Sequence, residues 1–349
     1  MTGGSFYFLL PGRPEAPTGG FVYDRRMVRA LRARGRLAGC LVLPGNYPDP
    51  ANEARDGVAR LLRELPDGAA LIVDGLAFSP LFEAFAAEAA RLRIYALVHH
   101  PLCDETGLAP AERARLFERE RRSLPLASGI IVTSRHTATR LADFGMPAAR
   151  IRVVRPGIGA ARRRTSAPSG TTVLLCVGSL TPRKGQDVLL RALARLRRFA
   201  WRLLLAGPAR DAVFAGRLRR LARDLRIRDR VAFRGPVDNA ELARLYGAAD
   251  LFVLPSHHEG YGIAAAQAAG YGLPVIASNA GALPEAVAGA RHRLVPPGDP
   301  LALMDALRPV LSARCTAGGR WRAPVDPRPR SWASAGQEFV TALDELAGR

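Results

Sequence analysis

A strand passes into a helix through Val177-Gly178-Ser179-Leu180-Thr181-Pro182-Arg183-Lys184-Gly185. The run Thr172–Val177 is typical of a buried strand, and the apolar spacing of Asp187–Leu196 predicts a helix. Glycines let the backbone approach a ligand, and Arg183 and Lys184 fall where a helix N-terminus favours an anion. The segment therefore predicts a diphosphate-binding loop that needs no metal; the alternative is a solvated basic turn.

Lys184 is the only lysine among the 51 basic residues of the chain, and all the others are arginines. An ammonium acts as a compact point charge that a guanidinium does not reproduce. Chance survival of one lysine at a neutral surface site is the alternative. Its place beside the expected helix start favours a functional role.

Strands and helices alternate on both sides of this loop, which predicts an α/β fold with helices on both faces of parallel sheets. The expected strands are Phe6–Leu10, Cys40–Leu43, Ala69–Val73, Ile94–Val98, Gly129–Thr133, Ile151–Val154, Thr172–Val177, Arg202–Ala206, Val231–Phe233, Leu251–Leu254, Pro274–Ala277 and Arg293–Val295. Helical spacing is found in Tyr23–Arg34, Pro80–Leu92, Pro110–Leu124 and Trp332–Leu346.

The alternation stops at Gly157–Gly170, a stretch rich in Gly, Arg, Ser and Pro that fits a linker. At 349 residues the chain exceeds the usual size of one hydrophobic core. We therefore expect two doubly wound domains, residues 1–160 and 168–330. A Pro- and Arg-rich stretch, Arg322–Arg330, precedes a final helix in residues 331–349, which we expect to pack back on the first domain.

The bulk composition excludes several classes of protein. No segment reaches the roughly 18 apolar residues of a membrane-spanning helix, and the N-terminus lacks the basic region of a signal peptide, so we expect a cytoplasmic protein. The cysteines are scattered, without ligand spacing, which argues against zinc and against a disulfide framework. They are Cys40, Cys103, Cys176 and Cys315.

The formal net charge of +20 attracts polyanions. The excess is spread over helix faces such as Arg191–Arg198 and Arg217–Arg230 without interleaved aromatic residues, so we expect no specific nucleic-acid binding. The first domain carries arginines on or near one helix, which is compatible with peripheral contact at the anionic inner face of a membrane. These are Arg25, Arg26, Arg29, Arg32 and Arg34.

A second glycine-containing loop is Leu254-Pro255-Ser256-His257-His258-Glu259-Gly260-Tyr261-Gly262, followed by the expected helix Ile263–Gly270. Gly260 and Gly262 allow backbone amides to point at phosphate or sugar oxygens, and Glu259 accepts hydrogen bonds from hydroxyls. The alternative is a carboxylate that only stabilises the helix start. Open parallel sheets bind ligands at the carboxyl ends of their strands, where both loops fall.

Taken together, these motifs resemble the retaining GT-B glycosyltransferases of the family 4 type, and the resemblance covers nearly the whole chain. The matching segments are Gly178–Gly185, Gly235-Pro236-Val237, Glu259–Gln267, Gly272-Leu273-Pro274-Val275, Gly281-Ala282-Leu283-Pro284-Glu285, Pro297-Gly298-Asp299 and the helix that starts at Ser331-Trp332. The resemblance implies two Rossmann-like domains that face a central cleft. It also implies transfer of a sugar from a UDP- or GDP-sugar to a hydroxyl, with retention of configuration and without a metal or other cofactor.

The resemblance implies roles for individual residues in the second domain. Arg183 and Lys184 would stabilise the leaving diphosphate, with Arg183 compensating for Ser179, where many relatives have arginine. Glu259 begins a motif that ends in a second glutamate in relatives but in Gln267 here, and a neutral amide is a weaker acceptor for ribose hydroxyls. The implied donor-binding residues are Gly178, Ser179, Pro236, Val237, Gly260, Tyr261, Gly262, Ile263 and Gln267.

Two features of the first domain extend the resemblance. Pro17-Thr18-Gly19-Gly20-Phe21-Val22-Tyr23 follows the first expected strand, and relatives use such a glycine pair near the donor phosphates and the acceptor. His99 and His100 directly follow the expected strand Ile94–Val98, where relatives carry a histidine that faces the donor sugar; we favour His99 as that residue. An ordinary strand-to-helix turn and a structural histidine are the alternatives.

The sequence is also compatible with other activities. A nucleotide-sugar epimerase or a phosphorylase has the same architecture, and Gln267 and Ser179 favour a nucleotide-sugar-binding protein that has lost catalysis. The acceptor is not named by the sequence, because its contacts are expected from the loops Pro44–Glu53 and Leu102–Glu112. A lipid, a polysaccharide and a small metabolite are all compatible with the composition.

Overall fold

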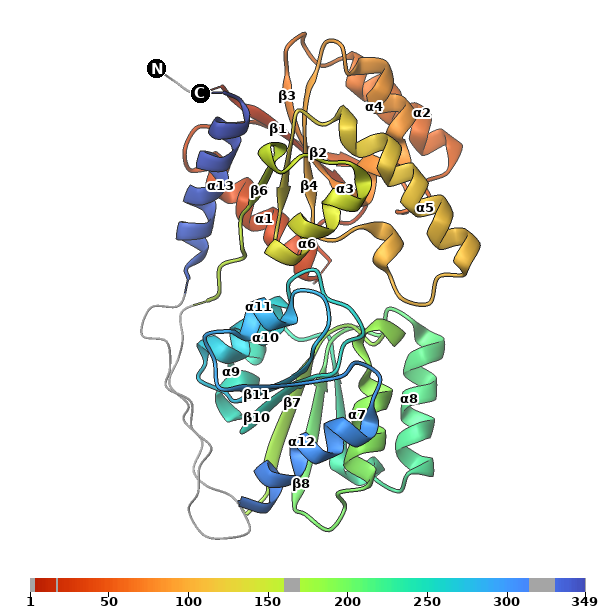
Figure 1. Ribbon diagram of the computed structural model, residues 1–349, viewed down its shortest axis with the longest axis vertical. Coiled ribbons are helices and arrows are strands. Elements are labelled where there is room, and N and C mark those ends of the chain that lie inside the picture. The colour runs from red at the N-terminus through yellow and green to blue at the C-terminus, as the bar shows by residue number, and fades with distance from the viewer. Residues whose placement is uncertain (1–3, 17, 160–169, 314–329, 349) are drawn as a thin grey trace. The chain divides into compact units, whose positions relative to one another are not determined.

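A computed structural model of the chain describes residues 4–16, 18–159, 170–313 and 330–348 (Figure 1). The chain forms two compact units, one of Met1–Gly157 with Arg330–Arg349 and one of Ile158–Pro329. Most of the expected linker and of the Pro- and Arg-rich stretch lies outside the described residues, as do Pro17 and Cys315.

The first unit is built on a six-stranded parallel sheet in the order β2-β1-β3-β4-β5-β6. Its strands are β1 Phe6–Pro11, β2 Leu37–Leu43, β3 Ala70–Asp74, β4 Arg93–Val98, β5 Gly129–Val132 and β6 Ile151–Val153. Its helices are α1 Gly19–Arg32, α2 Asn52–Arg63, α3 Gly75–Phe78, α4 Phe82–Glu88, α5 Pro110–Ser123, α6 Arg135–Arg140 and α13 Trp332–Leu346.

Helices cover both faces of this sheet, because β3, β4 and β5 are apolar and buried along nearly their whole length. Helices α1 and α13 pack on one face, and α2, α4 and α5 lie on the other (Figure 1). The last helix is held to the first unit by a two-pronged ion pair, in which Arg36 Nη2 lies 2.6 Å from Asp344 Oδ1. Phe8 of β1 stacks on Phe339 of α13.

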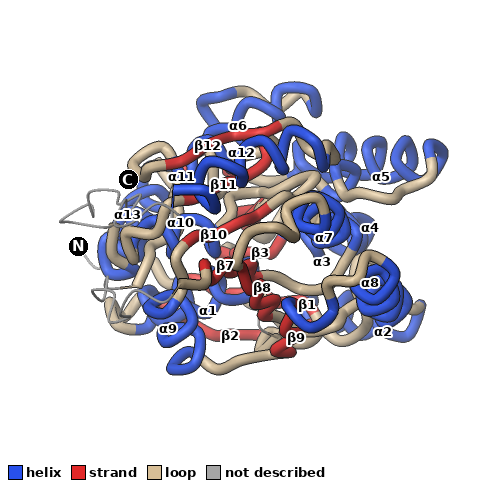
Figure 2. Tube along the Cα trace, turned by 90° about the horizontal axis from the view of Figure 1, so that it is seen from below, coloured by secondary structure: helices blue, strands red, loops and turns tan. Residues whose placement is uncertain are grey.

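The second unit repeats the plan with a parallel sheet in the order β12-β11-β10-β7-β8-β9. Its strands are β7 Thr172–Val177, β8 Trp201–Ala206, β9 Val231–Gly235, β10 Leu251–Leu254, β11 Val275–Ser278 and β12 His292–Val295. Its helices are α7 Gln186–Ala194, α8 Ala212–Asp224, α9 Asn239–Ala248, α10 Ile263–Gly270, α11 Leu283–Val287 and α12 Pro300–Ala313. In Figure 2 the strands form a row with α7 and α8 on one side and α9 and α10 on the other.

Every expected strand is present, and the doubly wound α/β class is confirmed in both units. The expected start of β2 at Cys40 is three residues late, because this edge strand alternates half-buried and exposed residues from Leu37 and lacks a continuous apolar run there. Part of the region expected to be an acceptor loop belongs to α2, which starts at Asn52. None of the described helices is long and apolar enough to cross a membrane.

Candidate nucleotide-sugar site and an aspartate-flanked histidine

The two glycine-containing loops of the second unit meet at one edge of its sheet. Strands β7 and β10 are neighbours, so the loops that follow their carboxyl ends lie side by side. The backbone N–H of His257 donates to Arg183 O at 2.8 Å, and Arg183 Nη1 donates to His258 O at 2.9 Å. These bonds tie the two loops to each other at the expected place for a ligand.

Lys184 and Glu259 are in direct contact. Lys184 Nζ lies 2.5 Å from Glu259 Oε1, which also accepts from Ser256 Oγ at 2.7 Å. Arg183 Nη1 lies 3.6 Å from the other carboxylate oxygen. Glu259 is 6% exposed, so its charge is buried among these three donors. The sequence did not predict this contact, because the two residues are 75 positions apart.

The charge of Glu259 depends on these neighbours. Burial alone raises the pKa of Glu259, but the charges of Lys184 and Arg183 and the hydrogen bonds from Lys184 and Ser256 outweigh it and lower the pKa to about 2. The carboxylate is therefore ionised at neutral pH and orients both cations. An ammonium has three N–H donors, so Lys184 can hold Glu259 and still donate to a second anion.

Glycines allow the close packing of these loops. Gly185 has a φ of +63°, and a Cβ there would collide with the carbonyl oxygen of Pro255 in the second loop. Gly178 lies against the side chain of Lys184, where a Cβ would come within 3.3 Å of Lys184 Cδ. A side chain at Gly185 would separate the loops, and one at Gly178 would press on the lysine.

Helix α10 begins at the end of the second loop. Its N-cap residue is Gly262, with a φ of +96°, and its first helical residue is Ile263. The N-terminal amides of this eight-residue helix lie just after Glu259, Gly260 and Tyr261 in the chain. Half-buried Gln267 lies one turn further along α10, and its Oε1 is 3.4 Å from the hydroxyl of Tyr246 in α9.

The other expected donor-binding residues are more widely spread. Gly178 and Ser179 follow β7, and Ser179 O accepts from Gln186 Nε2 at 3.0 Å. Pro236 and Val237 follow β9, which is separated from β7 by β8. The structure brings Arg183, Lys184 and Glu259 into contact, has Gly178 and Ser179 in the same loop as the two cations, and places Pro236 and Val237 after a different strand of the sheet.

In the first unit, His99 lies against two buried aspartates. His99 Nε2 is 2.9 Å from Asp24 Oδ1 on α1 and 3.9 Å from Asp74 Oδ2 at the end of β3. Gly20 packs against the same ring, because a Cβ there would lie 3.2 Å from His99 Cδ2. One ligand atom from each of Asp24, Asp74 and His99 lies within 4.8 Å of the others, a grouping that could hold a metal ion.

The other residues expected at the site of the first unit are Gly19, Gly20 and His100. Gly19 and Gly20 open helix α1, whose N-cap residue Thr18 accepts from Phe21 N. His100 points differently from His99, with its Nε2 3.6 Å from Glu105 Oε2. His99 and His100 are adjacent in the chain but have different carboxylate neighbours, a difference that the sequence did not predict.

Sequence reasoning missed Asp24 and Asp74. A signal for Asp24 was present, since it is three residues from both Phe21 and Met27 and falls on the apolar face of α1. Asp74 ends an apolar strand directly before Gly75, at the carboxyl edge where ligands bind. A carboxylate on an apolar face is uncommon without a function or a partner.

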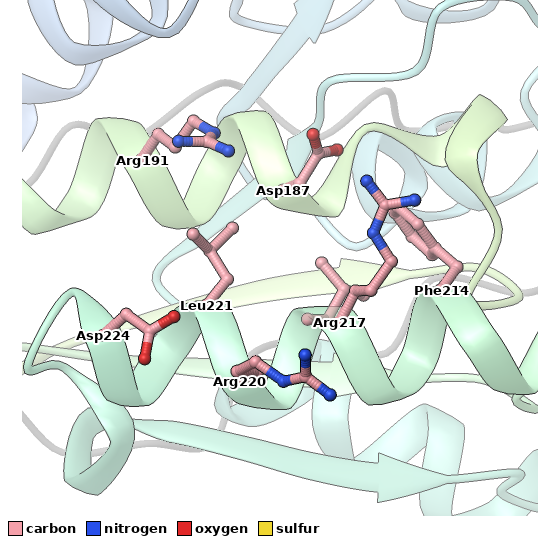
Figure 3. A pocket seen from close by; sticks show the side chains of 8 residues that line it. Asp187, Arg191, Phe214, Arg217, Arg220, Leu221 and Asp224 are labelled. Atoms are coloured by element: carbon pink, nitrogen blue, oxygen red, sulfur yellow. The ribbon is translucent and has the colours of Figure 1, made fainter.

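A separate hollow of about 240 Å³ lies between α7 and α8 (Figure 3). Arginines and two aspartates surround a partly apolar floor, and the lining side chains come from the helices rather than from the strand ends. They include Asp187, Arg191, Phe214, Arg217, Arg220, Leu221 and Asp224. None of the expected site residues lines this hollow, so it is distinct from the candidate site.

Two doubly wound parallel units, with a basic pair and a helix N-terminus at the strand ends of the second, define a two-domain Rossmann-like protein of the GT-B class. Residues 171–313 match the family described as glycosyl transferases group 1, and residues 18–162 match glycosyltransferase family 4. The two matches together cover most of the chain. The protein therefore belongs to the family 4 glycosyltransferases.

The chain is similar to enzymes named D-inositol 3-phosphate glycosyltransferase. The protein of Geodermatophilus obscurus is 34% identical over 265 residues, which are 68% of this chain and 59% of that protein. The protein of Kineococcus radiotolerans is 34% identical over 263 residues, or 70% of this chain and 55% of that protein. The chain thus matches little more than half the length of these relatives.

Solved structures share the fold at lower identity. Sucrose-phosphate synthase from Thermosynechococcus elongatus superposes with a TM-score of 0.75 at 20% identity, covering 99% of this chain and 94% of that one. Anabaena Alr3699/HepE, solved in complex with UDP and glucose, has a TM-score of 0.73 at 18% identity and covers 98% of this chain and 100% of that one. These similarities confirm the GT-B fold.

Proposed function

We propose that the chain transfers a hexose from a UDP- or GDP-sugar to a hydroxyl acceptor, with retention of configuration and without a bound metal. The observation that carries the proposal is the contact of Lys184 and Arg183 with Glu259 beside the start of α10. Two cations and helix N-terminal amides at one sheet edge suit the charge that develops on a leaving diphosphate. The nucleotide in the Anabaena complex supports a nucleoside diphosphate donor.

In this proposal Lys184 and Arg183 stabilise the departing diphosphate, and the N–H groups from Gly262 onward add to the same field. Glu259 holds both cations in place. As the diphosphate departs, the sugar becomes oxocarbenium-like. The acceptor hydroxyl attacks this sugar on the face that the diphosphate leaves. Loss of a proton from that hydroxyl to the leaving phosphate completes the exchange.

A transfer assay tests the proposal. Purified protein is incubated with UDP- and GDP-hexoses and with a panel of hydroxyl acceptors, in the presence of EDTA. D-inositol 3-phosphate is the first acceptor to include, because two relatives that are 34% identical to this chain are named D-inositol 3-phosphate glycosyltransferase. A glycosylated product with the anomeric configuration of the donor is expected. An inverted product, or activity abolished by EDTA, would contradict the retaining or metal-free part.

Gln267 supports a second candidate, a nucleotide-sugar-binding protein without catalysis. Its Oε1 lies 3.4 Å from the Tyr246 hydroxyl, so part of its acceptor capacity faces the protein. This candidate predicts donor binding with no turnover in wild type or Gln267→Glu. Epimerised donor or phosphorolysis in the same assay would instead favour the two related enzyme classes.

A further inference from the structure

His99 and the two carboxyl groups beside it come from three different elements of the first unit. Asp24 comes from α1 and Asp74 from the end of β3, while His99 follows β4. Asp24 is 0% exposed and Asp74 is 3% exposed, so both carboxyl groups are shielded from solvent. Tyr23 packs edge-on against the imidazole at 5.5 Å between ring centroids, and Gly20 lies against its Cδ2 and Nε2. The ring is therefore enclosed on several sides.

The two carboxyl groups have few basic neighbours. Among the described residues, His99 is the only basic side chain within 4 Å of either one. Asp24 Oδ1 faces His99 Nε2, but Asp24 Oδ2 is buried and has no hydrogen-bond partner in the described part of the chain. Two adjacent buried carboxylates do not both ionise, and one of them keeps its proton.

The hydrogen bonds indicate which group carries that proton. Asp74 Oδ1 already accepts the backbone N–H of Leu76 at 2.7 Å, as the N-cap of α3. Asp74 Oδ2 is the oxygen on the side of the histidine. A proton on Asp74 can be donated to Asp24 Oδ2, which supplies the partner that this buried oxygen lacks.

We propose that Asp24 and Asp74 are positioning residues that share one proton, with Asp74 as its main carrier, and that they fix a neutral His99 with Nε2–H donating to Asp24 Oδ1. The Nδ1 atom of His99 then carries a lone pair and accepts a hydrogen bond from a hydroxyl of the ligand. The identity of that hydroxyl as part of the sugar or acceptor rests on the proposed function. The arrangement of the three side chains does not.

The electrostatic surroundings agree with a single shared negative charge. Burial raises the pKa of both aspartates and lowers the pKa of His99. The charged group on α1 that acts on Asp24 is Arg25, which opposes the rise without removing it. Arg330 acts on the adjacent Tyr23, whose pKa is raised well above its ordinary value by burial. The cluster therefore favours a neutral imidazole and a protonated carboxyl group at neutral pH.

Nitrogen-15 spectra of the histidine side chains of the full-length protein test the arrangement without relying on activity. His99→Gln assigns the resonance, and spectra are recorded from about pH 6 to about pH 9. The expected signature is a neutral ring protonated at Nε2. Asp74→Asn should retain it, because the amide can accept from Leu76 N–H and donate to Asp24 Oδ2 as a protonated Asp74 does. Asp24→Ala and Asp74→Ala should each lose the single tautomer, because neither variant keeps a polar side-chain atom at that position.

Kinetic measurements give a second readout. Asp24→Ala, which removes the acceptor, should lower kcat/KM by ~10- to 100-fold, the range of one hydrogen bond to a charged group. Asp74→Asn should stay within ~3-fold at neutral pH and extend activity to higher pH, because its proton cannot be lost. The matched control is Asp67→Asn, whose side chain is 87% exposed and should change neither readout. If no transferase activity is found, the proposed function fails but the spectra still decide this arrangement.

Two results would overturn it. One is a His99 ring protonated on both nitrogens at neutral pH, which contradicts a neutral imidazole with a lone pair on Nδ1. The other is a shift of the His99 Nε2 resonance on adding Zn²⁺, Mn²⁺ or Mg²⁺ to EDTA-treated protein, abolished by both Asp24→Asn and Asp74→Asn. That pattern would identify a metal ion, rather than a proton, between the carboxyl groups.

Discussion

The ammonium of Lys184 lies 2.5 Å from a carboxylate oxygen of Glu259, at the meeting of the loops that follow β7 and β10. Both side chains are largely buried, with 15% and 8% exposed. A buried ion pair contributes little over an apolar pair, but removing one partner leaves an unpaired charge. The only lysine of the chain is thus needed by the folded state as well as by the proposed chemistry.

Lys184→Met should destabilise the protein by up to about 3–5 kcal/mol, the usual penalty for removing one partner of a buried ion pair, because among the described residues Glu259 then keeps only Ser256 and the more distant Arg183. The double variant Lys184→Met/Glu259→Gln removes both charges and should recover most of that loss, while transfer stays abolished. Thermal melting and donor turnover measure the two effects. Arg223→Met, at an exposed site on α8, is the control for charge removal and should leave both unchanged. A double variant no more stable than the single one would contradict a buried pair.

Glu259 should contribute to the pH dependence of stability. Its folded pKa is lowered to about 2, so its contribution is present above its unfolded value near 4.5 and is lost as the pH falls towards 2. The difference in melting temperature between wild type and Glu259→Gln should therefore shrink between about pH 5 and about pH 2. A difference independent of pH in this range would show that the carboxylate is not held in its charged form.

The aspartate pair beside His99 predicts the opposite slope. The folded pKa is raised to about 7 for Asp24 and about 8 for Asp74, so the folded state binds more protons than the unfolded state between about pH 4 and pH 8. Stability from this pair is present below pH 4 and decreases as the pH rises through that window. The melting temperature of Asp74→Asn should fall less than that of wild type from pH 5 to pH 8. Melting temperatures of the two proteins that change in parallel with pH would contradict raised pKa values for the two aspartates.

Gly20→Ala should impair function without unfolding the protein. The new Cβ would lie 3.2 Å from His99 Cδ2 and 3.4 Å from Nε2, so the ring must shift, while alanine is a better helix former than glycine. We expect an unchanged or slightly higher melting temperature and a loss of about tenfold or more in kcat/KM, because small misplacements are costly in catalysis. Gly216→Ala on α8 meets no atom within 4 Å and is the matched control.

Gln267→Glu should strengthen donor binding. A carboxylate is a stronger acceptor for ribose hydroxyls than an amide, and a charged hydrogen bond is worth roughly twice a neutral one. We expect KM for the donor to fall several-fold with little change in kcat, measured as initial rates over donor concentration. Weaker donor binding by Gln267→Glu would contradict a contact between this side chain and the ribose hydroxyls.

Much of the fold could be predicted from the sequence, because parallel strands buried on both faces read as short apolar runs. Strands β7 and β10 and helices α10 and α13 match their expected bounds. Edge strand β2 was cut short because one face is exposed. Within the site, Lys184 and Glu259 could be identified separately from their loops. Their contact could not, since it depends on which strands are neighbours, and the same reason hid Asp24 and Asp74 beside His99.

The most direct test of the proposed nucleotide-sugar transferase is a thermal-shift titration with UDP, GDP, ADP and their hexose derivatives in EDTA. Ligand at about 100 times its Kd stabilises the folded state by about 2.7 kcal/mol. We predict a clear rise in melting temperature with at least one nucleoside diphosphate and its sugar, and none for Lys184→Met/Glu259→Gln. No shift with any of these ligands, or an equal shift in the double variant, would contradict a donor site at Lys184 and Glu259.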